Sequence, residues 1–325
     1  MFVAACDFFT LDVADFIGKA IPEEDVHFFL NKHGKSIRSL DCIGGAVTEE
    51  AVSGSARKYL GAVKEAGRIY RRIEAAKGAT HFITEVSMDE TDVPQSPLDL
   101  YLILVALADE GIPVATIAPR FSGRFNKGVD YVGDVDRFAQ EFEADVRVIA
   151  RAVSDFGLPS GLKLSIHSGS DKFSIYPVIG RIIRKHHAGL HLKTAGTTWL
   201  EEVISLAEVG GDALDMAIEI YGNALSRMDD LCRPYASVID IKSSKLPSLD
   251  IVRGWSGREF ASAVRHDPFC SSYNPDMRQL LHVGYKVAAE MGARYIDMLE
   301  HCETKVSENV MENIYERHLK RIFET

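Results

Sequence analysis

The sequence has few cysteines and no long apolar run, and each absence excludes a class of protein. The longest apolar run, about 100–108, is much shorter than the ~20 residues that a membrane-spanning helix needs. The cysteines form no CxxC pair and show no metal-ligand spacing, so we expect free thiols in a reducing cytosol and a cytoplasmic protein. These cysteines are Cys6, Cys42, Cys232, Cys270 and Cys302.

A surplus of positive charge is also absent. The chain carries 37 basic and 47 acidic side chains, for a net charge of -10. Nucleic-acid binding requires a basic surface, so nucleic acid is not expected as the main partner. The first residues lack a basic region followed by an apolar core, so no signal peptide is expected either. Neither nucleic acid nor a membrane is therefore predicted as a partner.

The sequence alternates between strand and helix patterns, which favours an α/β fold with a mostly parallel sheet. It has no low-complexity tract and no linker rich in Pro, Gly or Ser. We therefore expect one catalytic domain over 1–325, with a loop-rich insertion at about 18–48 and a helical C-terminal part at about 256–325.

Six strands and nine helices are predicted, in a βα rhythm. A closed (β/α)8 barrel has eight strands, so the expected fold is a TIM-barrel-like parallel barrel, complete or incomplete, with C-terminal helices. The helix at 198–206 is predicted to open with the capping box Thr198-x-x-Glu201. The strands are expected at 8–13, 80–89, 112–119, 162–167, 190–194 and 236–241. The helices are expected at 49–77, 98–110, 135–156, 174–185, 198–206, 212–231, 257–264, 277–291 and 306–323.

The second strand carries acids on one face. Glu85, Ser87 and Asp89 alternate with Val86 and Met88, so the two sets point to opposite faces. A carboxylate in a central strand is costly to bury unless a metal or another cation pairs with it. The pattern therefore indicates a positive centre near Glu85 and Asp89, although Asp89 could instead cap the following turn.

His167 ends the fourth strand and is followed by a small, polar turn. A neutral imidazole there suits a divalent metal or general-base chemistry, and the alternative is a hydrogen-bonded core histidine. The turn Ser168-Gly-Ser-Asp171-Lys172 leads into a helix start. Such a turn brings backbone N–H groups and one ammonium close to an anion, so it predicts a carboxylate or phosphate site.

The fifth strand repeats this arrangement with His191 and Lys193 on one face. A lysine in a central strand needs a partner, because its ammonium would otherwise be desolvated. A catalytic base, a Schiff-base amine and a substrate clamp all fit Lys193. A salt bridge to Glu85 or Asp89 is the structural alternative.

Arginine and lysine side chains follow other strands. Arg120 comes directly after the third strand, and its planar fork suits a carboxylate. Arg124 and Lys127 lie in the next loop, where an ordinary solvated basic loop explains them equally well. Arg278 and His282 are four residues apart and share a helix face. Together these side chains are typical of a metal-assisted enzyme of sugars or sugar acids.

Several longer stretches resemble the tagaturonate/fructuronate epimerase family, over nearly the whole chain. The matching stretches are 85–91 (EVSMDET), 117–121 (IAPRF), 127–134 (KGVDYVGD), 167–174 (HSGSDKFS), 191–197 (HLKTAGT) and 278–282 (RQLLH). The resemblance implies a metal-dependent, barrel-like isomerase of hexuronate breakdown that interconverts D-tagaturonate and D-fructuronate. Some relatives accept the neutral ketohexoses fructose and tagatose.

The resemblance also implies roles for individual residues. Glu85 and His167 would bind a divalent metal, for which zinc, manganese, nickel and iron are candidates. Asp89, His191 and Lys193 would lie at the reacting carbons. Arg120 and Lys172 would hold the substrate carboxylate, with Ser168 and Asp171 in the same substrate-binding turn. A homo-oligomer is compatible with the family.

Members of this family carry a substantial N-terminal part ahead of the segment that matches 8–12. It supplies the first barrel strands and a closely spaced acid and histidine near the metal. We therefore expect this chain to hold only part of the barrel, which keeps two other hypotheses open. One is a truncated or non-catalytic sugar-acid-binding subunit, and the other is an aldolase that uses Lys193 as a Schiff base.

Overall fold

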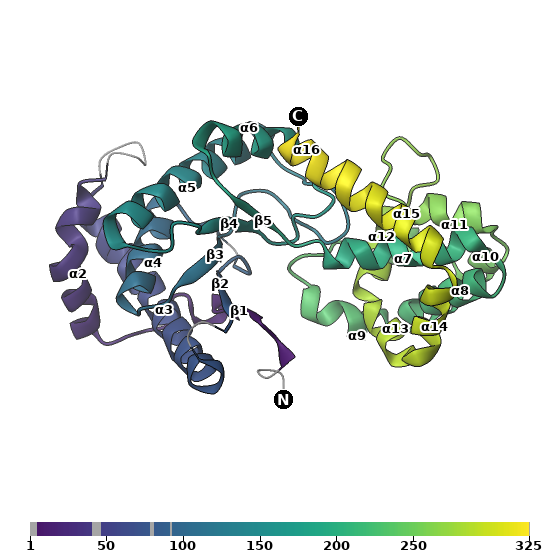
Figure 1. Ribbon diagram of the computed structural model, residues 1–325, viewed down its shortest axis with the longest axis horizontal. Helices are drawn as coiled ribbons and strands as arrows, with labels where there is room; N and C mark the ends of the chain where they lie inside the picture. The colour runs from purple at the N-terminus through teal and green to yellow at the C-terminus, as the bar shows by residue number, and fades with distance from the viewer. Residues whose placement is uncertain (1–4, 41–46, 79–80, 92, 325) are drawn as a thin grey trace. The chain divides into compact units, whose positions relative to one another are not determined.

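Figure 1 shows a computed structural model of the chain, which describes residues 5–40, 47–78, 81–91 and 93–324. The chain divides into two compact units, each built from several stretches. The first unit comprises Met1–Ser122, Asp134–His167 and Ile182–His191. The second comprises Gly123–Gly133, Ser168–Arg181 and Leu192–Thr325.

The first unit contains a five-stranded sheet whose spatial order is the order of the sequence. Its first four strands pair in parallel. Such an order lacks the reversal that marks a doubly wound sheet, and it keeps the connecting helices on one side. The fold is thus α/β with a sequential sheet. The strands are β1 (Phe8–Asp12), β2 (Ile83–Ser87), β3 (Val114–Ala118), β4 (Lys163–Ile166) and β5 (Leu190–Leu192).

Three helices of the first unit lie along one side of the sheet (Figure 1). They are α3 (Glu49–Lys77), α4 (Pro97–Asp109) and α5 (Val135–Phe156). α4 packs between α3 and α5, and every residue from 100 to 107 is buried. This explains the apolar run in the sequence, because a helix covered on all sides needs no polar face. Ser96 and Asp99 form a reciprocal capping box at its start.

The predicted loop-rich insertion at 18–48 is wrong, because its middle forms helix α2 (Glu23–Arg38). Val26, Phe29 and Ile37 bury one face of this helix, and acidic residues fill its first turn. His33 is also buried, with Nε2 2.7 Å from Asp109 Oδ2. The helix has few apolar residues and contains Gly34, so its periodicity is weak in the sequence.

The second unit is built mainly from helices around its own core. Two predicted helices there are divided, at 277–291 and 306–323, and the one at 212–231 breaks at Arg227. The helices are α7 (Ala195–Val209), α8 (Gly211–Ser226), α9 (Met228–Cys232), α10 (Leu249–Arg253), α11 (Gly257–Val264), α12 (Pro275–Val283), α13 (Tyr285–Met291), α14 (Ala293–His301), α15 (Glu303–Met311), the π-helix η4 (Glu312–Leu319) and α16 (Lys320–Phe323). Helix α6 (Tyr176–His186) contributes residues to both units.

Two further sequence predictions fail in the second unit. Residues 236–241 form no strand, because Val238 accepts a hydrogen bond from the Lys127 N–H and the Asp240 N–H donates to Gln279 Oε1. The capping box at Thr198 is also wrong. Helix α7 begins three residues earlier, at Ala195, and the Thr198 hydroxyl donates to the Thr194 carbonyl inside the first turn.

The composition-based predictions can be compared with the described residues. Cys6, Cys232, Cys270 and Cys302 are free thiols as predicted, and Cys42 lies outside the described residues. Among the helices described, none combines the length and the apolar content that crossing a membrane would require.

Candidate functional site

Glu85 is the centre of the candidate site. It lies in β2 with no exposed surface, and strand register places Thr10 of β1 and Thr116 of β3 on either side of it. The Thr10 hydroxyl donates to Oε1 at 3.0 Å and the Thr116 hydroxyl donates to Oε2 at 2.8 Å. The sheet therefore fixes both carboxylate oxygens of Glu85 from the neighbouring strands.

Two imidazoles bind the same carboxylate. His167, directly after β4, has Nε2 2.8 Å from Glu85 Oε1 and Nδ1 2.9 Å from Asp89 Oδ1. His191 of β5 has Nδ1 3.0 Å from Glu85 Oε2 and 3.0 Å from the Ser165 hydroxyl. We call Glu85, Asp89, His167 and His191 the carboxylate–imidazole cluster. The predicted meeting of Glu85, Asp89 and His167 on one face is confirmed by these contacts.

His167 lies between two acids. Its ring nitrogens face carboxylate oxygens of Glu85 and Asp89 at 2.8 and 2.9 Å. A doubly protonated ring at this position would donate to both carboxylates and would supply the positive centre that two neighbouring acids require. Burial alone would raise the pKa of Asp89, but hydrogen bonds from His167 and Ser87 outweigh it and hold that pKa below its ordinary value. Asp89 is thus ionised at neutral pH.

The cluster is partly open. Glu85 is fully enclosed, whereas Asp89 and His167 each expose 14% of their side chains and His191 exposes 28%. Asp89 and both imidazoles therefore keep exposed surface, while Glu85, which contacts both imidazoles, has none. This arrangement is suited to moving a proton between a ligand hydroxyl and a carboxylate.

The side chains of the cluster also suit a divalent metal in their chemistry. Carboxylate oxygens and imidazole nitrogens are the ligands that zinc, manganese, nickel and iron share. A bound metal ion would supply a positive charge beside Glu85 and Asp89. Within the described residues, however, no group of three such side chains is arranged around a common point for an ion. Glu85 and His167 would accordingly be part of a ligand set, and their role as ligands stays a prediction.

The turn after His167 is held by internal contacts. Asp171 is fully buried, and its Oδ2 accepts hydrogen bonds from Arg278 Nη2 at 2.7 Å and from the Thr197 hydroxyl at 3.0 Å. Burial raises the pKa of Asp171, but Arg278 and His266 outweigh that effect and hold it well below its usual range. The carboxylate is therefore the partner of an internal arginine, and its predicted contact with substrate stays a prediction.

Lys172 is also enclosed, with no exposed surface. Its Nζ donates to the carbonyls of Asn126, Val129 and Ser170 at 2.9, 2.6 and 3.1 Å. Burial lowers its pKa to about 7. Three carbonyls can accept all three ammonium hydrogens, so Lys172 connects two loops, and its predicted contact with a substrate carboxylate stays a prediction.

Further contacts complete this network in the second unit. The backbone N–H of Asp171 donates to His318 Nε2 at 2.9 Å, from the π-helix η4. Arg278 also donates to the carbonyls of Gly128 and Val264, and its Nη2 lies 3.9 Å from Glu201 Oε1. We call Asp171, Glu201, His266, Arg278 and His318 the buried ion-pair cluster. Ser168 and Asp171 have φ of 48° and 61°, a strained conformation that this network holds.

Three other predicted site residues lie near strand ends. Arg120 follows β3 in the first unit, half-buried, and its N–H donates to Gln95 Oε1. Ser168 and Lys193 belong to the second unit, and the Ser168 hydroxyl lies 3.5 Å from Lys127 Nζ. The roles predicted for Lys193 and Arg120 stay predictions.

Sequence reasoning missed the residues that hold Glu85. Thr10 and Thr116 each stand one strand away, and nothing short of the strand register identifies them. Ser87 was recognised on the right face, although its donation to Asp89 at 2.6 Å was not. A hydroxyl residue near the middle of each flanking strand was the only available signal.

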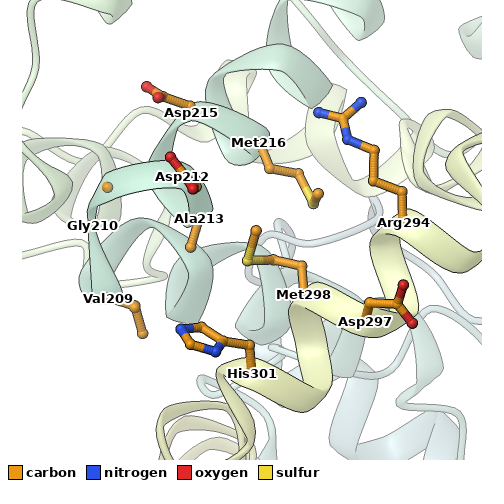
Figure 2. Close-up of a pocket in the computed structure, with 11 residues that line it drawn as sticks. Val209, Gly210, Asp212, Ala213, Asp215, Met216, Arg294, Asp297, Met298 and His301 are labelled. Atoms are coloured by element: carbon orange, nitrogen blue, oxygen red, sulfur yellow. The ribbon is translucent and has the colours of Figure 1, made fainter.

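A wide groove of about 900 Å³ in the second unit contains none of the predicted site residues (Figure 2). Met216 and Met298 lie between a wall from the start of α8 and a wall from α14. Arg294 on the second wall is already paired with Glu219. The groove therefore offers no grouping comparable to the carboxylate–imidazole cluster.

Comparisons with known proteins agree on one family. A family model described as tagaturonate epimerase matches residues 20–322. The tagaturonate/fructuronate epimerase of Thermotoga maritima is 33% identical over 242 residues, which is 73% of this chain and 44% of that protein. The chain thus spans less than half the length of this curated relative.

Solved structures show the same fold. A glycerol-bound crystal structure of fructuronate-tagaturonate epimerase from Cohnella laeviribosi superposes with a TM-score of 0.75 at 24% identity. The native crystal structure of that enzyme gives 0.72 at 25% identity. Both alignments cover 97% of this chain and 64% of the other. The α/β architecture with its five-stranded sheet is therefore that of a known fold.

Proposed function

The chain belongs to the tagaturonate epimerase family, and on that premise we propose that its carboxylate–imidazole cluster serves the interconversion of D-tagaturonate and D-fructuronate. The observation that carries the proposal is His167 between Glu85 and Asp89, at 2.8 and 2.9 Å. The substrate would be a sugar acid. The relatives are longer than this chain, so the activity of this chain is itself a proposal.

The reaction requires more than removal of one proton. The two sugars differ at a carbinol carbon one step beyond the carbon beside the ketone, so deprotonation next to the carbonyl cannot invert it. In the proposed route a base takes the proton of the hydroxyl on that carbinol carbon. The bond between the two carbinol carbons breaks, and its electron pair moves to the ketone to give an enediolate and an aldehyde. The aldehyde rotates, the bond forms again on its other face, and the base returns the proton.

Asp89 is the proposed base. It is ionised and partly exposed, so its carboxylate can accept the hydroxyl proton, and its Oδ1 lies 2.9 Å from His167 Nδ1. Glu85 orients His167 and His191 without contacting solvent. Bound by Glu85 and His167, a divalent metal would supply Lewis acidity toward the ketone.

We also propose that the sheet is part of a (β/α) barrel. Its five strands follow one another in sequence order, as the wall of such a barrel does. Its polar residues lie at and just after the carboxyl ends of β2, β4 and β5, where barrel enzymes place their sites.

The test is an epimerase assay on D-tagaturonate with the purified chain, after chelation and again after addition of zinc, manganese, nickel or iron. Glu85→Gln should lower turnover by about 100-fold or more, because the neutral amide no longer holds two imidazoles. The control is Glu50→Gln, an exposed glutamate in the first turn of α3, which should have the activity of the unmodified chain.

Two results would overturn the proposal. One is a folded chain that, supplied with metal, does not convert D-tagaturonate. The other is a Glu85→Gln variant as active as the control. Borohydride trapping with substrate tests the aldolase alternative, since reduction of a Schiff base would label Lys193.

A further inference from the structure

The last helical stretch of the second unit turns polar side chains inward. Helix α15, the π-helix η4 and α16 follow one another directly over 303–323 and are drawn in yellow in Figure 1. Asn309 and Asn313 each donate a hydrogen bond of 2.9 Å to a side chain of α7. His318 is fully buried in the buried ion-pair cluster. The inner face therefore carries amide and imidazole groups, at positions where a surface helix ordinarily presents apolar side chains to the core.

The outer face of the same stretch carries a row of apolar and aromatic side chains. They recur every four residues, a spacing that aligns them on one side of a helix. Their exposed fractions lie between 40% and 58%. Single exposed apolar residues are common on proteins, but a contiguous patch of them often marks an interaction surface. Methionine, tyrosine and phenylalanine are also enriched at the centre of protein–protein interfaces. We call Met311, Tyr315, Leu319 and Phe323 the apolar stripe.

The π-helix keeps the apolar stripe straight. In an α-helix with 3.6 residues per turn, positions four apart move gradually round the axis. The i to i+5 hydrogen bonds of a π-helix give a wider turn with more residues, which offsets this movement. The π-helix η4 covers Glu312–Leu319, the middle of the stripe. Because π-helical turns are rare and occur frequently at functional sites, their position here supports a role for the outer face.

The charges along this stretch change sign from its start to its end. Residues 303–312 carry three glutamates and one lysine, and residues 313–323 carry three arginine or lysine side chains and one glutamate. Two copies of the stretch lying antiparallel would place the acidic half of one against the basic half of the other. A parallel arrangement would instead bring like charges together. Charge complementarity therefore favours a second copy of this chain as the partner of the stripe.

We propose that the apolar stripe is the contact surface of a homodimer, in which this helical stretch packs antiparallel against the same stretch of a second copy of the chain. Met311 of one copy then packs against Phe323 of the other, and Tyr315 packs against Leu319. Each copy buries the same patch, as a two-fold interface requires. A single pair of helices forms an interface at the low end of the usual range, below about 1,200 Å² of total buried surface, so the dimer dissociates on dilution.

The charged residues beside the stripe fit the same arrangement. Glu312, Glu316 and Lys320 each follow a stripe residue by one position, so they lie in a row along one side of it. In the antiparallel pair the rows of the two copies face each other, and Lys320 of one copy comes between Glu312 and Glu316 of the other. Lys320 already lies 2.8 Å from Glu316 of its own chain, but a pair between exposed side chains contributes little stability and can be exchanged.

The experiment measures the dimer dissociation constant of the full chain by sedimentation velocity, over a dilution series from about 100 µM to about 1 µM. Met311→Lys combined with Leu319→Lys should raise that constant by about 100-fold or more, because it places ammonium groups from both copies in the centre of the contact. The control is Ile251→Lys on α10, which should leave the constant unchanged, since Ile251 is about as exposed as Met311 and belongs to the same unit. Circular dichroism checks that each variant is folded.

Charge reversal tests the orientation of the two helices. Glu312→Lys should weaken the dimer several-fold, because lysines of the two copies then face each other, and adding Lys320→Glu should recover most of the loss. A chain that is monomeric at about 100 µM would overturn the inference, whether its stripe then binds another protein or a lipid surface. A dimer that Met311→Lys with Leu319→Lys leaves intact would also overturn it, as would a Glu312→Lys defect that Lys320→Glu does not relieve.

Discussion

The carboxylate–imidazole cluster and the buried ion-pair cluster use the same kinds of side chain and have opposite properties. His167 and Asp171 are four residues apart, yet one belongs to a partly open group in the first unit and the other to a sealed group in the second. Arg278 donates to three different acceptors, all within the protein. The difference teaches that residue type alone does not identify a site. The deciding feature is exposure: Asp171, Arg278 and His318 have no exposed side-chain surface, whereas Asp89, His167 and His191 keep some.

The largest expected effect is on the stability that the buried ion-pair cluster contributes. Arg278→Met should lower the free energy of unfolding by about 3–5 kcal/mol, because it leaves the Asp171 carboxylate buried without its cation. Urea unfolding followed by circular dichroism measures this, and Arg253→Met, on an exposed side chain, is the control. A loss below about 1 kcal/mol would contradict the structural role that we assign to Arg278 as the partner of Asp171.

Mutations in the carboxylate–imidazole cluster should change activity more than stability. Asp89→Asn should reduce epimerase turnover by about 100-fold, because the amide cannot take up the hydroxyl proton. Its free energy of unfolding should fall less than that of Arg278→Met, since the asparagine oxygen can still accept hydrogen bonds from His167 and Ser87. Steady-state kinetics with Asp250→Asn, an exposed acid, as control separates the two effects. Unchanged turnover in Asp89→Asn would remove it from the mechanism.

The pH dependence of stability tests the buried ion-pair cluster through Glu201. Burial raises the pKa of Glu201 to about 7 from an ordinary value of 4.5, although Arg278 opposes the shift. Between these two values the folded chain binds the proton more tightly than the unfolded chain, so this group's contribution to stability is lost as the pH rises.

Glu201→Gln removes that dependence. From about pH 5 to about pH 7, the free energy of unfolding of the unmodified chain should fall by about 2 kcal/mol relative to the variant. Chemical unfolding at the two pH values gives the difference directly. Parallel curves for the two proteins would show that Glu201 stays ionised beside Arg278.

The smallest expected losses of stability concern N-cap residues, one at a helix of each unit. Ser96→Ala at α4 and Ser256→Ala at α11 each break a reciprocal capping box and should cost about 1 kcal/mol. Thr198→Ala should cost much less, because Thr198 lies inside α7 and caps nothing. Thermal unfolding of the three variants tests this order. A larger loss for Thr198→Ala than for the two serine variants would support the capping box that the sequence predicted at Thr198.

The sequence predicted most of the first unit because its signals are local. Helices α3 and α5 begin and end as predicted, because a cap residue marks the start of each helix and a glycine marks its end. Helix α2 was missed because its apolar face is sparse. The segment 236–241 was mistaken for a strand because it contains Val238, Ile239 and Ile241, which are β-branched and typical of strands. In the site, strand alternation was sufficient to group Glu85 with Asp89. The burial of Asp171 and Lys172 could not be predicted, because their partners lie 107 and 46 residues away.

The strained turn at Ser168–Asp171 has a consequence for synthesis on the ribosome. Its last partner, His318, is 147 residues further along the chain. At a translation rate of 5–20 residues per second, about 7–30 seconds pass before that histidine exists. During this interval the turn after His167 lacks its hydrogen bond to His318. The nascent chain must therefore keep the edge of the neighbouring strand β4 from pairing with other molecules until the C-terminal helix is made.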